Sequence, residues 1–206
     1  MLERFRQFWT NVFKPISHLL IKLGVSPDAV TFVGTAGVAA GALVFFPRGD
    51  LWIGVLVITA FVFADLIDGD MARTLGTSSK WGAFLDSTLD RLGDAAIFGG
   101  LAVWFFRGGD DALLAYVALW ALVMGSVTSY ARAKAESLGM QAKGGIAERA
   151  DRLVSVLVLT FFADVLDLPI LLTVVLWALA VASTVTVGQR MLLVRRQALA
   201  DPATSR

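Results

Sequence analysis

Four aspartates at helical spacing are the residues of this chain best suited to chemistry. Asp65 and Asp68 are three residues apart, and Asp86 and Asp90 are four apart, so each pair lies on one face of a predicted helix. Both pairs lie at the junction of two long apolar segments. Because a carboxylate inside a bilayer costs roughly 2.5 to 3.5 kcal/mol, four unpaired ones would cost on the order of 10 kcal/mol. The sequence therefore predicts that a cation lies among them.

The composition limits which cation this is. The 206 residues include no cysteine and only one histidine, His18, which excludes thiolate catalysis, sulfur-ligated zinc and a histidine-based metal site or triad. Carboxylate oxygens alone favour Mg²⁺ or Mn²⁺. Four carboxylates from two adjacent helices can hold two such ions, an arrangement that clamps a phosphoryl or pyrophosphoryl group. The alternative is a structural role, as a helix cap or an ion-pair partner, and this is our interpretation of Asp70 and Asp94.

Three further residues near the aspartates suit a phosphate ligand. Gly69 and Gly82 would let a nucleotide or a neighbouring backbone approach closely. Arg73 could hold a phosphate through its forked guanidinium, although it could equally be one of the basic residues that flank membrane helices.

These residues must be positioned by membrane helices, because 57% of the chain is hydrophobic, compared with roughly 45 to 50% in soluble domains. We expect an all-α integral membrane protein. Residues 1–23 have the periodicity of an amphipathic helix that lies in the membrane interface. A single domain, residues 24–197, holds six predicted spans, and residues 198–206 form a polar tail that we expect to be disordered. The spans lie at about 29–46, 51–65, 81–106, 112–131, 149–165 and 170–187.

The distribution of basic residues predicts the orientation. The chain has 18 Lys and Arg, and of these only Arg48 and Arg107 lie in the turns after the first and third spans, with none in the turn after the fifth. The positive-inside rule therefore places both termini and the aspartates on the cytoplasmic side of the cell (inner) membrane.

The aspartates also belong to a longer pattern, D-x2-D-G-x2-A-R-x8-G-x3-D-x3-D. Its fixed positions are all present, as Asp65, Asp68, Gly69, Ala72, Arg73, Gly82, Asp86 and Asp90. This pattern is similar to the signature of the CDP-alcohol phosphotransferases, and the predicted spans and interfacial helix agree with that family over nearly the whole chain. The resemblance implies a metal-dependent enzyme, acting as a homodimer, that transfers a phosphatidyl group from CDP-diacylglycerol to an alcohol and releases CMP.

The resemblance also implies roles for individual residues. Asp65, Asp68, Asp86 and Asp90 would bind two Mg²⁺ or Mn²⁺ ions, and Asp90 would also be the catalytic base that takes the proton of the acceptor hydroxyl. The segment from Asp28 to Thr31 matches a Pro-Asn-x-x-Thr-like segment of the family, with Asp28 in place of Asn. The residues expected to bind CDP-diacylglycerol are Asp28, Ala29, Val30, Thr31, Gly69, Ala72, Arg73, Ser79 and Gly82.

Basic residues at the cytoplasmic ends of the last three spans indicate the acceptor. They would suit an alcohol that carries its own phosphate, although positive-inside charge is the alternative, which we prefer for Lys134, Lys143, Arg195 and Arg196. The region from Ser129 to Arg190 resembles the actinobacterial phosphatidylinositol phosphate synthases, with Arg at position 132 where Lys is usual and Ala at position 150 where Pro is usual. This resemblance implies inositol phosphate as the acceptor, with its phosphate held by Ser129, Arg132, Arg152 and Arg190.

Two other functions remain open from the sequence. A phosphatidylglycerophosphate synthase would use glycerol 3-phosphate, which is also a phosphorylated acceptor. In a membrane ion or proton transporter the acids would relay protons or bind cations, but such acids would lie deep in several spans rather than at one edge. Nothing in the sequence indicates a nucleic-acid partner.

Overall fold

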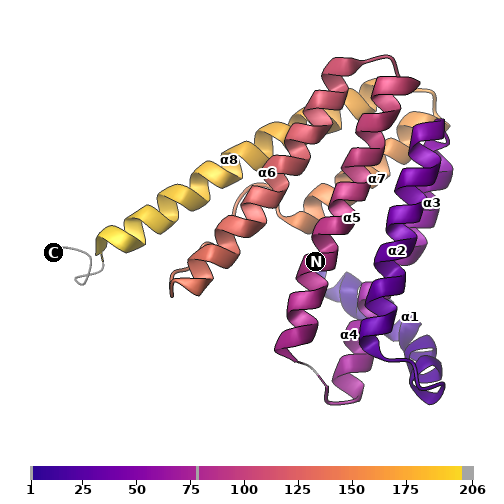
Figure 1. Cartoon of the computed structure of the whole chain (residues 1–206), viewed down its shortest axis with the longest axis vertical. Coiled ribbons are helices and arrows are strands. Elements are labelled where there is room, and N and C mark those ends of the chain that lie inside the picture. The colour runs from indigo at the N-terminus through magenta and orange to yellow at the C-terminus, as the bar shows by residue number, and fades with distance from the viewer. Residues whose placement is uncertain (1, 78, 201–206) are drawn as a thin grey trace.

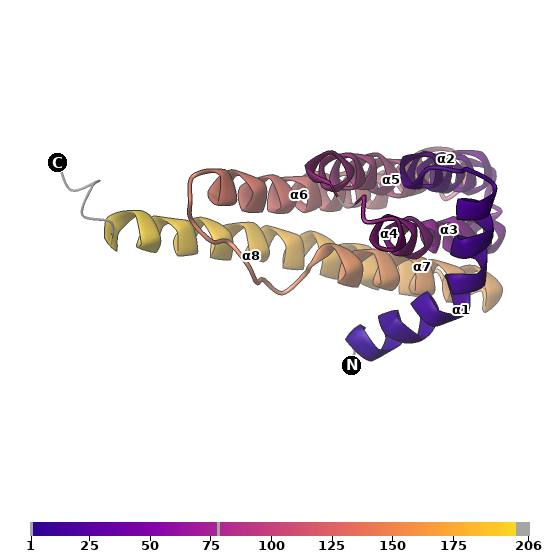
Figure 2. The same cartoon turned by 90° about the horizontal axis from the view of Figure 1, so that it is seen from below.

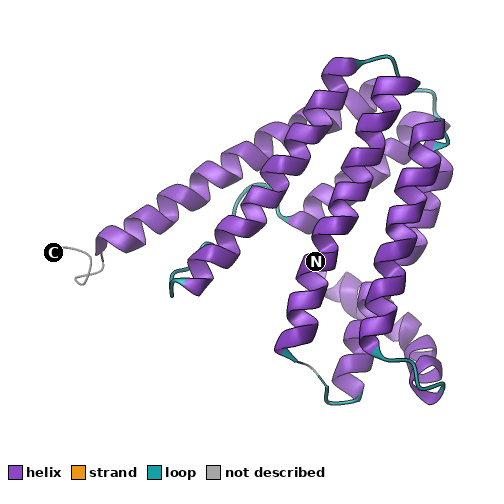
Figure 3. Cartoon of the chain, in the orientation of Figure 1, coloured by secondary structure: helices purple, strands orange, loops and turns teal. Residues whose placement is uncertain are grey.

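The computed structural model describes residues 2–77 and 79–200, while the side chains of residues 2–11 and of Asp65 lie outside the described part. Over these ranges the regular structure is helical (Figures 1 and 3). The α-helices are α1 (Leu2–Lys22), α2 (Pro27–Phe45), α3 (Leu51–Val62), α4 (Ala64–Thr74), α5 (Lys80–Arg107), α6 (Ala112–Ser137), α7 (Arg149–Val165) and α8 (Ile170–Ala200), and the 3₁₀ helix η1 is Phe46–Arg48.

Six of these helices pack as a closed ring, in the order α2, α5, α6, α8, α7 and α3, and α3 contacts α2 again. Figure 2 shows the ring as two layers, with α2, α5 and α6 in one and α3, α7 and α8 in the other. The short helix α4 continues from α3, and α1 packs against it at the edge of the ring. At the end that holds α4, helices α6 and α8 diverge from α2 and α5 (Figure 1).

Close packing of α2 against α3 and α4 depends on glycine. A Cβ atom at Gly37 would lie 2.2 Å from the Phe61 ring, and one at Gly34 would lie 2.6 Å from the Cβ of Ala64. Neither position has room for a larger residue. The Gly- and Ala-rich helix α2 therefore packs closely against its neighbours.

Four segments of the described chain are long and apolar enough to cross a membrane: Pro27–Arg48, Leu51–Thr74, Ala112–Ser137 and Ile170–Ala200. Large apolar side chains, such as Phe32, Val33, Trp52 and Leu56, are exposed on them. Such an outer surface suits lipid and not water. The chain is therefore a multi-pass membrane protein, and four of the six predicted spans are confirmed.

The other two predicted spans differ from these four. Helix α7 has 17 residues, slightly fewer than the roughly 20 that a perpendicular span needs. Helix α5 is longer, but its first half carries the charged residues of the site. Two boundaries also differ from the prediction: the second predicted span is divided at Phe63 into α3 and α4, and α8 continues to Ala200, three residues into the predicted polar tail.

Candidate active site

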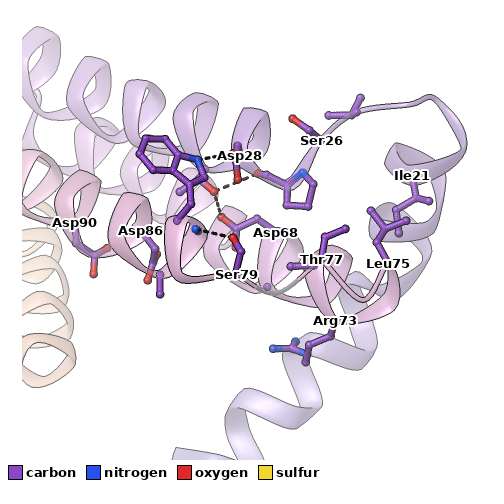
Figure 4. A pocket seen from close by; sticks show the side chains of 18 of the residues that line it. Ile21, Ser26, Asp28, Asp68, Arg73, Leu75, Thr77, Ser79, Asp86 and Asp90 are labelled. Carbon is purple, nitrogen blue, oxygen red and sulfur yellow. Dashed lines mark hydrogen bonds between the residues drawn. The ribbon is translucent and has the colours of Figure 1, made fainter.

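Three of the predicted metal ligands, Asp68, Asp86 and Asp90, line a cavity of about 850 Å³ between α2, α4 and α5, which we call the acidic cavity (Figure 4). Ten residues predicted to bind metal or CDP-diacylglycerol line it: Asp28, Thr31, Asp68, Gly69, Ala72, Arg73, Ser79, Gly82, Asp86 and Asp90. Of the others, Ala29 and Val30 lie on α2 but not in the lining, and the side chain of Asp65 lies outside the described residues.

Helical spacing places the carboxylates of Asp86 and Asp90 as the sequence predicted. Asp86 and Asp90 are one turn apart on α5, and Figure 4 shows both side chains on the same side of the helix. Asp68 lies on α4, is 8% exposed, and accepts a hydrogen bond of 2.5 Å from the hydroxyl of Thr31 on α2. This bond ties α2 to α4 at the cavity wall.

The donor set of the acidic cavity suits a divalent cation. Asp68, Asp86 and Asp90 present only oxygen ligands to one cavity, which Mg²⁺ and Mn²⁺ prefer. Among the described side chains no three acidic or histidine residues approach closely enough to hold an ion as they stand, and Asp65 is not part of that set. Two of the three carboxylates have other partners in this arrangement, since Asp68 binds Thr31 and Asp90 binds Arg149.

The predicted nucleotide contacts lie around the mouth of the acidic cavity. The indole nitrogen Nε1 of Trp81 donates a hydrogen bond of 2.9 Å to the carboxylate of Asp28, which joins α2 to α5. Ser79 is the N-cap of α5, and its hydroxyl accepts a hydrogen bond from the backbone N–H of Gly82 at 3.0 Å. The Arg73 side chain is 55% exposed and lies 3.9 Å from Asp70, a weak ion pair that leaves the guanidinium accessible.

A second cavity of about 690 Å³ lies between α5, α6, α7 and α8, and we call it the basic cavity. All four residues predicted to bind the acceptor phosphate, Ser129, Arg132, Arg152 and Arg190, line it. The four basic residues that we interpret as positive-inside charge, Lys134, Lys143, Arg195 and Arg196, are exposed and do not.

Main-chain carbonyls hold Arg152 in the basic cavity. Its Nη1 donates to the carbonyl of Ala147 at 3.1 Å, and its Nη2 donates to the carbonyl of Gly125 at 3.4 Å. Gly125 also makes space for this side chain, because a Cβ atom there would lie 3.0 Å from the Nε of Arg152. Arg152 is only 2% exposed, and Asp94 supplies a countercharge at 3.7 Å.

Arg190 is held in a similar way, and Arg132 is not. The Nη1 of Arg190 donates to the carbonyl of Thr128 at 2.6 Å, and its Nε donates to the carbonyl of Gly144 at 3.1 Å. The Arg132 side chain is 43% exposed and pairs with Glu136 at 3.0 Å along the same helix. Of the three predicted phosphate-binding arginines, two thus have fixed guanidinium groups and one can move with its exposed side chain.

Sequence reasoning did not single out Arg149, which joins the two cavities. Its Nη2 lies 2.9 Å from the carboxylate of Asp90, and its Nε lies 3.2 Å from that of Asp94. Asp90 and Arg149 are the two described residues that line both cavities. The interpretation of Asp94 as an ion-pair partner is confirmed. The sequence held a signal for Asp94, although not for Arg149: Asp94 follows Asp90 by four residues and so lies on the same helical face.

Comparison with known proteins places this site in a family. Residues 24–186 match the family model described as CDP-alcohol phosphatidyltransferase. A phosphatidylinositol phosphate synthase from Streptomyces avermitilis is 53% identical, covering 100% of this chain and 87% of the relative. One from Cutibacterium acnes is 50% identical, covering 95% of this chain and 98% of the relative.

Solved structures of a phosphatidylinositol phosphate synthase have a similar fold to this chain. A crystal structure of the Mycobacterium tuberculosis phosphatidylinositol phosphate synthase with CDP-DAG bound has a TM-score of 0.87 at 39% identity, covering 95% of this chain and 98% of that chain. A second crystal structure of the mycobacterial enzyme, in complex with manganese and citrate, has a TM-score of 0.86 at 40% identity, covering 93% of this chain and 91% of that chain.

Proposed function

Because the chain belongs to the CDP-alcohol phosphatidyltransferase family, we propose that it transfers the phosphatidyl group of CDP-diacylglycerol to inositol phosphate. The products are phosphatidylinositol phosphate and CMP. The observation that carries this proposal is the meeting of an acidic and a basic cavity at Asp90. The acidic cavity suits a metal-bound pyrophosphate, and the basic cavity suits a phosphorylated alcohol.

The acidic cavity takes the donor. Asp65, Asp68, Asp86 and Asp90 would hold Mg²⁺ or Mn²⁺, two ions in our proposal, and such ions would supply positive charge to balance the pyrophosphate and the departing CMP. The structure of the mycobacterial synthase with manganese supports the use of a divalent cation. The remaining predicted donor contacts, Asp28, Ala29, Val30, Thr31, Gly69, Ala72, Arg73, Ser79 and Gly82, surround the nucleotide.

The basic cavity takes the acceptor phosphate. Arg152 and Arg190 have part of each guanidinium bound to backbone carbonyls, which fixes the direction of the N–H groups that remain. A pre-oriented guanidinium loses little conformational freedom when it binds a phosphate. Ser129 and Arg132 complete the set of phosphate ligands.

Chemistry takes place where the cavities meet. Asp90 accepts the proton of the inositol hydroxyl, and the hydroxyl oxygen forms a bond to the phosphorus that carries diacylglycerol. The bond from this phosphorus to the bridging oxygen of the pyrophosphate breaks, and its electron pair leaves with CMP.

We also propose the placement of the enzyme in the cell membrane. Helices α5 and α7 complete a set of six spans, and α1 lies in the interface, where its amphipathic sequence suits it. Both termini and both cavities face the cytoplasm, because basic residues gather at that end of the spans. The family resemblance supports a homodimer.

One assay tests this function directly. Purified protein in detergent, with CDP-diacylglycerol and Mg²⁺, is offered inositol phosphate, glycerol 3-phosphate, free inositol or serine in separate reactions, and CMP release is measured. We expect release with inositol phosphate alone. Release with glycerol 3-phosphate instead would make the enzyme a phosphatidylglycerophosphate synthase, and no release with any acceptor, together with ion flux in vesicles, would support a transporter.

A further inference from the structure

The arginine between the two cavities has no role in the function described so far. Arg149 is the first residue of α7, and Glu148 and Asp151 form a capping box around it that fixes where this helix begins. Its side chain crosses from α7 to α5. Among the described residues both cavities share only Asp90 and Arg149, so Arg149 is the basic residue at their junction. A donor in one cavity and an acceptor in the other can react only near this junction.

Two carboxylates fix the orientation of the Arg149 guanidinium. Its Nη2 lies 2.9 Å from Asp90 and its Nε lies 3.2 Å from Asp94, so one edge of the planar group is bound to two successive turns of α5. Within the described residues, no hydrogen bond or ion pair engages its Nη1. The opposite edge of the group is therefore available to a ligand, and the side chain is 28% exposed.

We propose that Arg149 is a further catalytic residue, which donates N–H bonds to a non-bridging oxygen of the phosphoryl group during its transfer. This inference rests on the proposed function. The acceptor oxygen bonds to phosphorus, the bond to the CMP oxygen breaks with its electron pair, and the hydroxyl proton goes to Asp90. Arg149 keeps its own protons throughout and stabilises the charge that builds up on the phosphoryl oxygens, as fixed donors do in other active sites.

Asp94 is the positioning residue for this arginine. It is 7% exposed and lines neither cavity, so it acts through its partners. Besides Arg149 it lies 3.7 Å from Arg152 and 3.8 Å from Arg91. One buried carboxylate thus orients both the arginine at the junction and a predicted ligand of the acceptor phosphate.

The test is a comparison of kcat and KM across variants of the full-length protein in detergent. Arg149→Gln should lower kcat by roughly 100-fold or more, the usual loss when one fixed donor to a reacting oxygen is removed. Arg149→Lys keeps the charge but loses the planar guanidinium with its paired N–H donors, and we expect kcat to fall by about 10-fold. In both variants the KM for inositol phosphate should stay within about threefold, because Arg149 acts on the transferred group.

Arg91→Gln is the matched control for charge. Arg91 lies 3.8 Å from the same two carboxylates but lines only the basic cavity, so its loss of kcat should be at least about 10-fold smaller than that of Arg149→Gln. Asp94→Asn should lower kcat and raise the KM for inositol phosphate together, and Asp94→Glu should restore part of both. Binding of CDP-diacylglycerol shows which variants are folded.

Three results would overturn the proposal. One is a kcat within threefold of the wild type in Arg149→Gln. Another is an increase only in the KM for inositol phosphate, which would make Arg149 an acceptor ligand. The third is loss of donor binding in both Arg149 variants, which would give the residue a role in folding. An inactive wild type would instead contradict the proposed function, so the two failures are distinguishable.

Discussion

The two cavities hold their charged side chains in different ways. In the basic cavity, Arg152 and Arg190 are almost fully buried and bonded to main-chain carbonyls. In the acidic cavity, Asp68 accepts a hydrogen bond from the side chain of Thr31, and Asp90 forms an ion pair with Arg149. A main-chain partner is fixed by the fold. A carboxylate with a side-chain partner can exchange that contact for a cation, and Asp94 still holds Arg149 when Asp90 does so.

This difference suggests separate roles for the two cavities, binding in the basic cavity and chemistry in the acidic cavity. The basic cavity is organised before any ligand arrives, and its arginines also connect α6, α7 and α8 to the loop of residues 138–148. The acidic cavity gathers negative charge whose partners must change when the donor and its cations bind. Substitutions in the acidic cavity should therefore remove turnover and spare the fold, while those in the basic cavity should affect acceptor binding and stability together.

Asp90→Asn should give the largest effect. An amide cannot accept the hydroxyl proton, and general-base catalysis contributes roughly 100- to 10,000-fold, so we expect CMP release to fall by about 1,000-fold. Binding of CDP-diacylglycerol should remain measurable. Asp167→Asn, in the exposed turn between α7 and α8, is the control and should retain full activity. Substantial activity of Asp90→Asn would remove Asp90 from the role of base.

Arg152→Ala should weaken binding of the acceptor and not of the donor, and should also lower the stability of the protein. It removes charge-assisted hydrogen bonds to the acceptor phosphate, each worth about 1.5 to 3 kcal/mol, so the KM for inositol phosphate should rise by roughly 10- to 100-fold. The KM for CDP-diacylglycerol should change little. Steady-state kinetics with each substrate varied in turn give both constants. If both constants rise together, the basic cavity is not the acceptor site.

Thr186→Val tests the claim that the basic cavity is part of the fold. The buried hydroxyl of Thr186 accepts hydrogen bonds from the backbone N–H groups of Ile146 and Ala147, and valine leaves both without an acceptor. Each unsatisfied group costs about 1 to 3 kcal/mol, so the melting temperature in detergent should fall and the loop should be cleaved faster by protease.

The control for this change lies two residues earlier on the same helix. The hydroxyl of Thr184 accepts a bond from the exposed Trp120, so Thr184→Val should cost about 1 kcal/mol or less and leave the loop protected. If Thr186→Val and Thr184→Val changed the melting temperature and the rate of cleavage equally, the loop would not be anchored by Thr186.

Trp81→Phe should have the smallest effect. It removes the single hydrogen bond from the exposed indole to Asp28 at the mouth of the acidic cavity. A neutral hydrogen bond contributes about 1 kcal/mol, so the KM for CDP-diacylglycerol should change by no more than about fivefold, with kcat unchanged. A large loss of kcat would show that the α2 to α5 link shapes the reacting centre.

Much of the acidic cavity could be predicted from the sequence, because its residues are close together in the chain. Helical spacing alone places Asp86 and Asp90 on one face, and Ser26 and Pro27 mark the beginning of α2. The hydroxyl of Ser26 caps this helix, because it accepts a hydrogen bond from the backbone N–H of Ala29. Where local periodicity decides the structure, sequence reasoning was sufficient.

Residues that meet across the fold could not be placed in this way. Arg149 and Asp90 are far apart in the chain and on different helices, so no spacing rule relates them. The carbonyl partners of Arg152 and Arg190 depend on how α6 lies beside α7 and α8. The division at Phe63 also had no signal, because neither proline nor glycine marks it. These features depend on tertiary packing.

The division of labour among the helices has an evolutionary consequence. The acidic cavity, the proposed donor site, is built mainly by α2, α4 and α5. The basic cavity, the proposed acceptor site, is built mainly by α6, α7 and α8, with Asp90 and Arg149 between them. Substitutions within residues 126–190 that keep Arg149 could thus exchange one alcohol for another without disturbing the reacting centre. If the proposed assignment of the cavities holds, a duplicated gene would need to change only one half of the bundle to make a lipid with a different headgroup.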